Sequence, residues 1–154
     1  HPLAFYAAYF SIRAKAFDLR IMTGDLKTQM TEFNRIKALD RAASPKDKDL
    51  MSALEVSMEM YQRGYRFVNV DIQHSEARRF SIKDGALLPP FLAIDSLGET
   101  VADAIVAERE ERPFTSLKDL QRRCKVSNTI IDLMKELKCC GELPEDEQMS
   151  LFGA

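Results

Sequence analysis

The sequence predicts a mainly α-helical protein with a small β-hairpin and two pairs of short helices in its C-terminal half. Apolar residues recur every three or four positions through most of the chain, which is the period of an amphipathic helix. Aromatic and β-branched residues gather between residues 67 and 88, around an Asp84-Gly85 turn. With 154 residues, the chain can bury a core without metal ions or disulfides.

Three helices are expected in the first 64 residues. Residues 3–16 are apolar on nearly every side, which favours a helix packed against two partners. The next helix, over 26–39, shows an apolar stripe made of Leu26, Met30, Phe33, Ile36 and Leu39. A third begins at Ser44-Pro45, because Ser caps free N–H groups and Pro tolerates the first helical turn, and it ends at Gly64.

A β-prone region and then short helices follow. The β-prone residues near 67–72, 80–82 and 86–88 fit either a small hairpin or a three-stranded patch, closed by Pro89-Pro90. Short helices are predicted at 91–94, 100–110, 116–123 and 127–137, the last ended by Gly141. The predicted segments are 1–43 (helices), 44–88 (helix and β patch), 89–141 (paired helices) and 142–154 (a flexible acidic tail).

The composition is that of a globular protein without a membrane span. Lys and Arg total 22 and Asp and Glu 24, so the net charge of −2 excludes a uniformly basic nucleic-acid binder but allows a local basic face. The longest apolar run, residues 3–10, is far shorter than the roughly 20 residues that cross a bilayer. The three cysteines suggest reduced thiols in a cytoplasmic protein, and no zinc-binding spacing is present. The chain begins with His1, so we expect a piece of a longer protein.

The turn within residues 94–102 resembles a helix-hairpin-helix motif. Such a hairpin offers backbone N–H groups at a helix N-terminus to a DNA phosphate. Ser96, Gly98 and Thr100 are its candidate DNA-binding residues, although the motif usually has Gly where this chain has Ser96. Asp95 and Glu99 flank the turn and would repel phosphate. A plain helical turn without a ligand is the alternative.

Residues 114–137 look like a degenerate second copy of this motif. Residues 113–140 hold six basic and three acidic side chains, a local charge of +3. The candidate DNA-binding residues here are Lys118, Arg122, Arg123, Lys125 and Ser127. They favour sequence-independent contact with the DNA backbone, since no arrangement for reading bases is evident. The alternative is a solvated helix face.

The tail ends in Gln148-Met149-Ser150-Leu151-Phe152. This pentapeptide resembles the one by which bacterial proteins dock on the sliding clamp. The resemblance implies that the Gln148 amide binds polar groups and that Leu151 and Phe152 enter an apolar pocket. In the alternative, Leu151 and Phe152 fold back onto the core of their own chain.

The sequence shows no catalytic set. His1 and His74 are the only histidines, no Ser/His/Asp grouping is present, and no glycine-rich phosphate loop occurs. We therefore expect no catalytic residue, metal site or cofactor in this chain. A repair enzyme would need a glycosylase or nuclease site, for which the sequence supplies no residues.

Taken together, residues 64–91, 93–102, 114–121 and the terminal pentapeptide resemble the C-terminal end of the PolC-type DNA polymerase III α subunits. The opening ten residues are similar to the fingers region of that family. The resemblance implies a fingers remnant, a duplex-binding segment and a clamp peptide. It also implies a nucleotidyltransferase whose Mg²⁺-binding palm aspartates lie upstream of this chain. Ser96 for Gly departs from the family, and Met149 for Leu is a mild change.

We therefore expect a noncatalytic part of a replicative DNA polymerase. It would bind product duplex through the backbone and a sliding clamp (the β subunit) through its tail, in the cytoplasm and with no membrane contact. Another replisome subunit would contact residues 3–39. The alternative is a replisome protein–protein scaffold without direct DNA contact.

Overall fold

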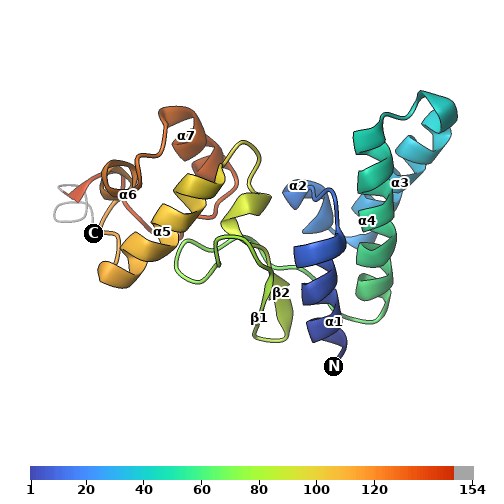
Figure 1. Ribbon diagram of the computed structural model, residues 1–154, viewed down its shortest axis with the longest axis horizontal. Helices are drawn as coiled ribbons and strands as arrows, with labels where there is room; N and C mark the ends of the chain where they lie inside the picture. Colours follow the sequence, from blue (N-terminus) through green and yellow to red (C-terminus); the bar gives the residue numbers. More distant parts are fainter. Residues whose placement is uncertain (148–154) are drawn as a thin grey trace. The chain divides into compact units, whose positions relative to one another are not determined.

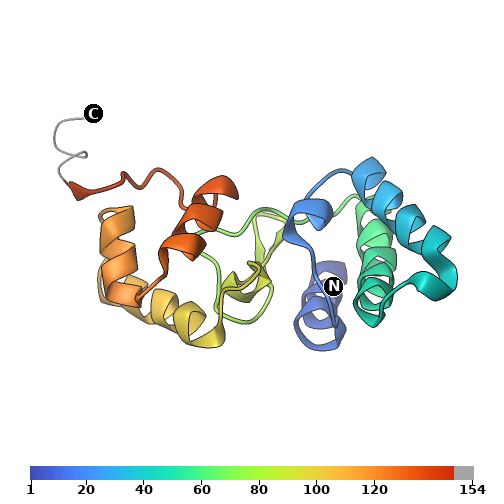
Figure 2. The same ribbon diagram turned by 90° about the horizontal axis from the view of Figure 1, so that it is seen from above.

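The computed structural model describes residues 1–147, and the mainly α-helical fold with one small sheet is confirmed. The chain divides into two units (Figures 1 and 2). Unit 1 comprises His1–Asn69 and Arg79–Pro89, and unit 2 comprises Val70–Arg78 and the chain from Pro90 onward. Within the described part, no helix is both long and apolar enough to span a bilayer. The four predicted segments stay a prediction.

Unit 1 is built on two helices that lie side by side, α3 (Leu26–Leu39) and α4 (Pro45–Gln62), joined through the 3-10 turn η2 (Asp40–Ala42) (Figure 1). The predicted start of α4 is confirmed in detail. The Ser44 hydroxyl accepts the Asp47 N–H at 3.0 Å, and the Asp47 carboxylate accepts the Ser44 N–H at 3.1 Å. This reciprocal capping box stabilises the first turn. Gly64, at φ +90°, follows the end of the helix, as predicted.

The predicted helix over residues 3–16 is interrupted. Helix α1 (Pro2–Ala8) passes into one π turn, η1 (Tyr9–Arg13), and the chain becomes extended at Ala14. The Ser11 hydroxyl donates to the Ala7 carbonyl at 2.6 Å and accepts the Phe80 N–H at 2.9 Å. It therefore ties the π turn to a distant part of unit 1. A further short helix, α2 (Leu19–Met22), precedes α3.

The core of unit 1 is aromatic. Phe10, Phe17, Phe67 and Phe80 contact one another with ring centroids 4.9 to 6.2 Å apart, mostly edge to face. Such pairs stabilise a core beyond the area that they bury. The apolar side chains of the N-terminal segment are therefore of two kinds. Some, such as Phe10, are buried in this core, and others, such as Phe5 and Ile12, are exposed.

Of the two arrangements that the sequence allows, the structure contains the hairpin and not the three-stranded patch. Strands β1 (Ser81–Lys83) and β2 (Ala86–Leu88) pair antiparallel through the Asp84-Gly85 turn, where both residues have positive φ. From the preceding β-prone stretch, Phe67 alone forms a bridge, to Leu87. The stretch leaves unit 1 after Asn69, so its later residues have no strand to pair with.

Up to residue 147, unit 2 contains four helical elements, in the order that the sequence predicts. They are η3 (Phe91–Ala93), α5 (Glu99–Glu111), α6 (Leu117–Cys124) and α7 (Asn128–Glu136). The end of α7 differs from the prediction: it stops at Glu136, and Lys138 rather than Gly141 is the first residue beyond it with positive φ. Loop Val70–Arg78 packs on these helices, where Arg109 donates to the Ile72 and Ser75 carbonyls at 3.0 and 2.9 Å.

Candidate nucleic-acid interface

The two predicted hairpins share one backbone pattern. In each, a left-handed residue precedes a buried apolar residue and then the N-cap of the next helix. The triplets are Ser96-Leu97-Gly98 before α5 and Lys125-Val126-Ser127 before α7, with φ +66° at Ser96 and +55° at Lys125. The turn before α7 therefore repeats the backbone pattern of the turn before α5.

The first hairpin leaves its candidate residues open to solvent. Ser96, Gly98 and Thr100 are exposed, while Leu97 is buried and anchors the turn. A Cβ atom at Gly98 would meet no protein atom within 4 Å, so internal packing does not require glycine there. Gly98 also provides no capping side chain to α5, whose first N–H groups can therefore donate hydrogen bonds to an outside ligand. Ser96 adopts a left-handed conformation that glycine tolerates far better.

Arg78 balances the acidic residues at this hairpin. Its guanidinium lies 3.5 Å from the Glu99 carboxylate and 2.6 Å from that of Asp103. The hydrogen bond from Arg78 holds the pKa of Asp103 below its ordinary value. The repulsion expected from acids at the turn is thus partly cancelled. The sequence offered no indication of this pairing, because Arg78 comes from loop Val70–Arg78, far from α5 along the chain.

At the second hairpin the basic residues separate into two kinds. The side chains of Lys118 and Arg122 on α6 are 69% and 67% exposed, and Lys125 is exposed in the turn. Ser127 caps α7, its hydroxyl accepting the Ile130 N–H at 3.2 Å. These residues stay on the candidate surface.

Arg123, predicted as a DNA-binding residue, belongs instead to the interior of unit 2. Its side chain is 8% exposed and donates to the Pro113 and Arg112 carbonyls at 3.3 and 3.0 Å. It also binds the Asp119 carboxylate at 3.1 Å and lies 4.6 Å from the centre of the Phe114 ring. A guanidinium engaged on all these groups is not free for phosphate.

Asp119 is the fully buried centre of this network. Burial by itself raises the pKa of the carboxyl, but hydrogen bonds from the Thr115 N–H and Arg123 outweigh it, so the pKa lies below the ordinary value. Arg122 also donates to this carboxylate, at 2.9 Å, from the solvent side. The network therefore fixes α6 against the residues before it.

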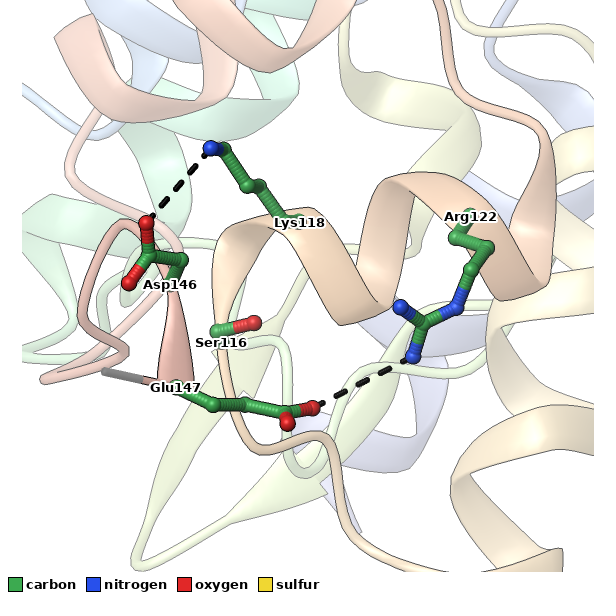
Figure 3. Close-up of a pocket in the computed structure, with 5 residues that line it drawn as sticks. All are labelled: Ser116, Lys118, Arg122, Asp146 and Glu147. Atoms are coloured by element: carbon green, nitrogen blue, oxygen red, sulfur yellow. Dashed lines mark hydrogen bonds and ion pairs between the residues drawn. The ribbon is translucent and has the colours of Figure 1, made fainter. Parts of the chain in front are cut away.

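The described part of the tail contacts α6 through Pro144–Glu147. Figure 3 shows Asp146 and Glu147 pointing toward Lys118 and Arg122 across a pocket of about 240 Å³ that Ser116 also lines. The predicted clamp peptide Gln148-Met149-Ser150-Leu151-Phe152 lies outside the described residues. Within residues 1–147, no group of three His, Cys, Asp or Glu side chains could hold a metal ion.

Comparison with known proteins agrees with this geometry. The family model of the helix-hairpin-helix motif matches residues 64–148. Proteins named DNA polymerase III PolC-type match 99% of this chain, with 42% identity in Caldanaerobacter subterraneus subsp. tengcongensis, 45% in Streptococcus suis and 43% in Streptococcus pyogenes serotype M12. The chain spans only 10 to 11% of the length of these relatives. The predicted resemblance is confirmed: the chain belongs to the helix-hairpin-helix motif family and is similar, over almost its whole length, to a short segment of PolC-type DNA polymerase III.

Proposed function

We propose that this chain is the part of a PolC-type replicative polymerase that holds product duplex and tethers the enzyme to a sliding clamp. The observation that carries the DNA role is the repeated hairpin of unit 2. Two turns with the same backbone each present a helix N-terminus, and Lys118, Arg122 and Lys125 lie exposed beside the second. Helix N-termini and exposed cations are the groups that bind DNA phosphates.

Binding of this kind is insensitive to DNA sequence. The candidate groups are backbone N–H groups, hydroxyls and cations, which contact phosphates rather than base edges. The proposed DNA-binding residues are Ser96, Gly98, Thr100, Lys118, Arg122, Lys125 and Ser127. Arg123 is not among them because its guanidinium is engaged inside unit 2. The role proposed for the chain is to hold the polymerase on duplex during processive replication.

Nucleotide addition is not assigned to these residues. The described residues contain no group of three His, Cys, Asp or Glu side chains that could hold a metal ion. We propose that the nucleotidyltransferase site and its Mg²⁺ belong to other parts of the polymerase. The three cysteines, Cys124, Cys139 and Cys140, are buried free thiols, which supports a reducing, cytoplasmic setting.

The proposed clamp contact uses Gln148 to Phe152. Burying Leu151 and Phe152 in a partner could contribute roughly 3–6 kcal/mol, and ordering the peptide and losing rigid-body freedom offset part of that. The peptide alone should bind weakly, and simultaneous DNA contact should strengthen attachment through avidity.

The DNA role is tested by the anisotropy of a labelled duplex of arbitrary sequence at about 50 and 200 mM salt. Arg122→Ala with Lys125→Ala should weaken all duplexes alike and flatten the salt dependence. Lys46→Ala with Lys48→Ala, which removes two exposed cations from α4 in unit 1, is the matched control. Absence of duplex binding at the lower salt would refute the role.

The clamp role is tested by gel filtration with a purified sliding clamp. The full chain should co-elute with the clamp, whereas Leu151→Ala with Phe152→Ala should not. Thermal unfolding of the double variant should match that of the parent. Clamp binding that survives both substitutions would refute this role.

A protein partner for unit 1 is a second proposal, favoured by a separate observation. Phe5, Ile12 and Ile82 are 63%, 70% and 46% exposed, which is unusual for large apolar side chains. They support contact with another part of the polymerase or with a further replisome subunit. If the chain binds such a partner but shows no salt-dependent duplex binding, the scaffold function replaces the DNA function.

A further inference from the structure

The acidic segment Pro144–Glu147 occupies the basic edge of α6. The Lys118 ammonium lies 3.5 Å from the Asp146 carboxylate, and the Arg122 guanidinium lies 4.0 Å from that of Glu147 (Figure 3). Lys135 on α7 pairs with Glu145. Three consecutive acidic residues therefore contact three of the six basic residues between positions 113 and 140.

Main-chain hydrogen bonds hold the same segment at the start of α6. The Leu117 N–H donates to the Pro144 carbonyl at 2.8 Å, and the Lys118 N–H donates to the Glu145 carbonyl at 3.1 Å. The Thr115 hydroxyl donates to the Glu147 carboxylate at 2.9 Å. Carbonyl and carboxylate oxygens thus occupy N–H, hydroxyl and cationic groups of the kind that bind a phosphate.

We propose that Pro144–Glu147 is a built-in competitor that occupies Lys118 and Arg122 until DNA displaces it. This inference rests on the proposed binding of the duplex backbone. It differs from a plain structural role because the basic partners of these ion pairs are mostly exposed, with 69% of Lys118 and 67% of Arg122 open to solvent, and neither carboxylate is buried. Pairs of this kind are weak and are screened by salt.

Duplex DNA can displace this segment from Lys118 and Arg122, whereas an anion of lower charge density displaces it less readily. Duplex DNA carries about one charge per 1.7 Å of its axis and gains further from the release of its counterions. The tail offers three carboxylates at one place. The segment therefore lowers the affinity for isolated anions and for brief, partial DNA contacts, while a fully seated duplex still displaces it.

The test neutralises the competitor in the full chain by Asp146→Asn with Glu147→Gln. These near-isosteric changes leave the main-chain hydrogen bonds to Pro144 and Glu145 in place. Affinity for an arbitrary duplex at low salt should rise by roughly two- to thirtyfold, the range for two exposed ion pairs, and the gain should shrink as salt increases. The matched control is Glu110→Gln with Glu111→Gln, which removes the same charge from exposed positions at the end of α5.

A second pair of variants shows whether the gain acts through the named cations. In a background carrying Lys118→Gln with Arg122→Gln, neutralising the segment should no longer increase affinity, because the groups in competition are gone. An equal gain in that background overturns the proposal.

The remaining outcomes separate the inference from the function on which it rests. If duplex affinity rises equally in the Glu110 and Glu111 control, or rises in neither variant, the proposal that Pro144–Glu147 competes with DNA is wrong, while duplex binding itself still stands. If neither the parent nor any variant binds duplex at low salt, the DNA function fails and the competitor fails with it.

Discussion

Arg123 and Arg122 are neighbours in the sequence, and the structure predicts opposite effects when each is replaced by Met. Arg123→Met removes the guanidinium from Asp119 and from the Arg112 and Pro113 carbonyls. The Asp119 carboxylate, with no exposed surface, then keeps Arg122 at 2.9 Å as its nearest cation. Arg122→Met leaves the buried pair intact.

The two substitutions should therefore lower the free energy of unfolding by different amounts. Removing one partner of a buried ion pair costs about 3–5 kcal/mol, because a buried charge is left uncompensated. The hydrogen bonds that Asp119 keeps from Arg122 and the Thr115 N–H place the expected cost for Arg123→Met near the lower limit, about 3 kcal/mol. Arg122→Met, at an exposed position, should cost less than about 1 kcal/mol.

Urea unfolding followed by circular dichroism measures the free energy of unfolding of both variants, and the anisotropy of a labelled duplex measures their DNA binding. Arg122→Met should keep the unfolding midpoint and weaken DNA binding. Arg123→Met should lower the midpoint at an unchanged slope. Combining Arg123→Met with Asp119→Asn should cost less than the sum of the single changes, because the stranded charge is gone. A stable Arg123→Met variant that has lost DNA affinity would refute this reasoning.

Three further predictions concern the same unit. Ser96→Gly should raise the free energy of unfolding by about 0.5–1 kcal/mol, because glycine removes the strain of φ +66°, and a lower thermal midpoint in this variant would contradict the reasoning. The folded protein should lose stability as the pH falls below the ordinary Asp value of 3.8, since the pKa of Asp119 is lower in the folded state and the unfolded chain takes up the proton first. Urea midpoints between about pH 5 and 2 should therefore fall less steeply in Asp119→Asn than in the parent. Burial raises the pKa of Cys124 to about 11, so mass spectrometry after brief iodoacetamide treatment at about pH 8 should find Cys124 unmodified in the folded protein and modified in urea.

The elements that the sequence predicts well are those set by neighbouring residues. The capping box of Ser44 and Asp47 and the Asp84-Gly85 turn each act within four residues, so their chemistry is visible in the sequence itself. The same holds for the Ser127 cap of α7. Local consistency of this kind makes element type and position predictable.

The features that sequence reasoning missed depend on contacts between distant residues. The π turn at Tyr9–Arg13 is tied to Phe80, and the β-prone stretch after Phe67 fails to form a strand because it passes into unit 2. Arg78 reaches Glu99 and Asp103 from another loop. None of these partners is indicated by spacing along the chain.

The basic residues between positions 113 and 140 differ in exposure once the chain is folded. Both arginines bind the Asp119 carboxylate, but the side chain of Arg123 is 8% exposed, whereas that of Arg122 is 67% exposed and also lies near Glu147. Counting charges over residues 113–140 therefore overstates the cations available to DNA, since Lys118, Arg122 and Lys135 already contact carboxylates.

The position of the acidic segment links the two proposed functions. Glu147, which contacts Thr115 and Arg122, directly precedes Gln148, the first residue of the proposed clamp peptide. A clamp that binds this peptide and pulls Asp146 and Glu147 from α6 would free Lys118 and Arg122 for DNA, and a duplex that displaces the two carboxylates would in turn favour binding of the clamp. Because coupling between two binding sites is reciprocal, each ligand would strengthen the other by the same factor. Attachment to the clamp and grip on the duplex would then reinforce each other without direct contact between the two ligands.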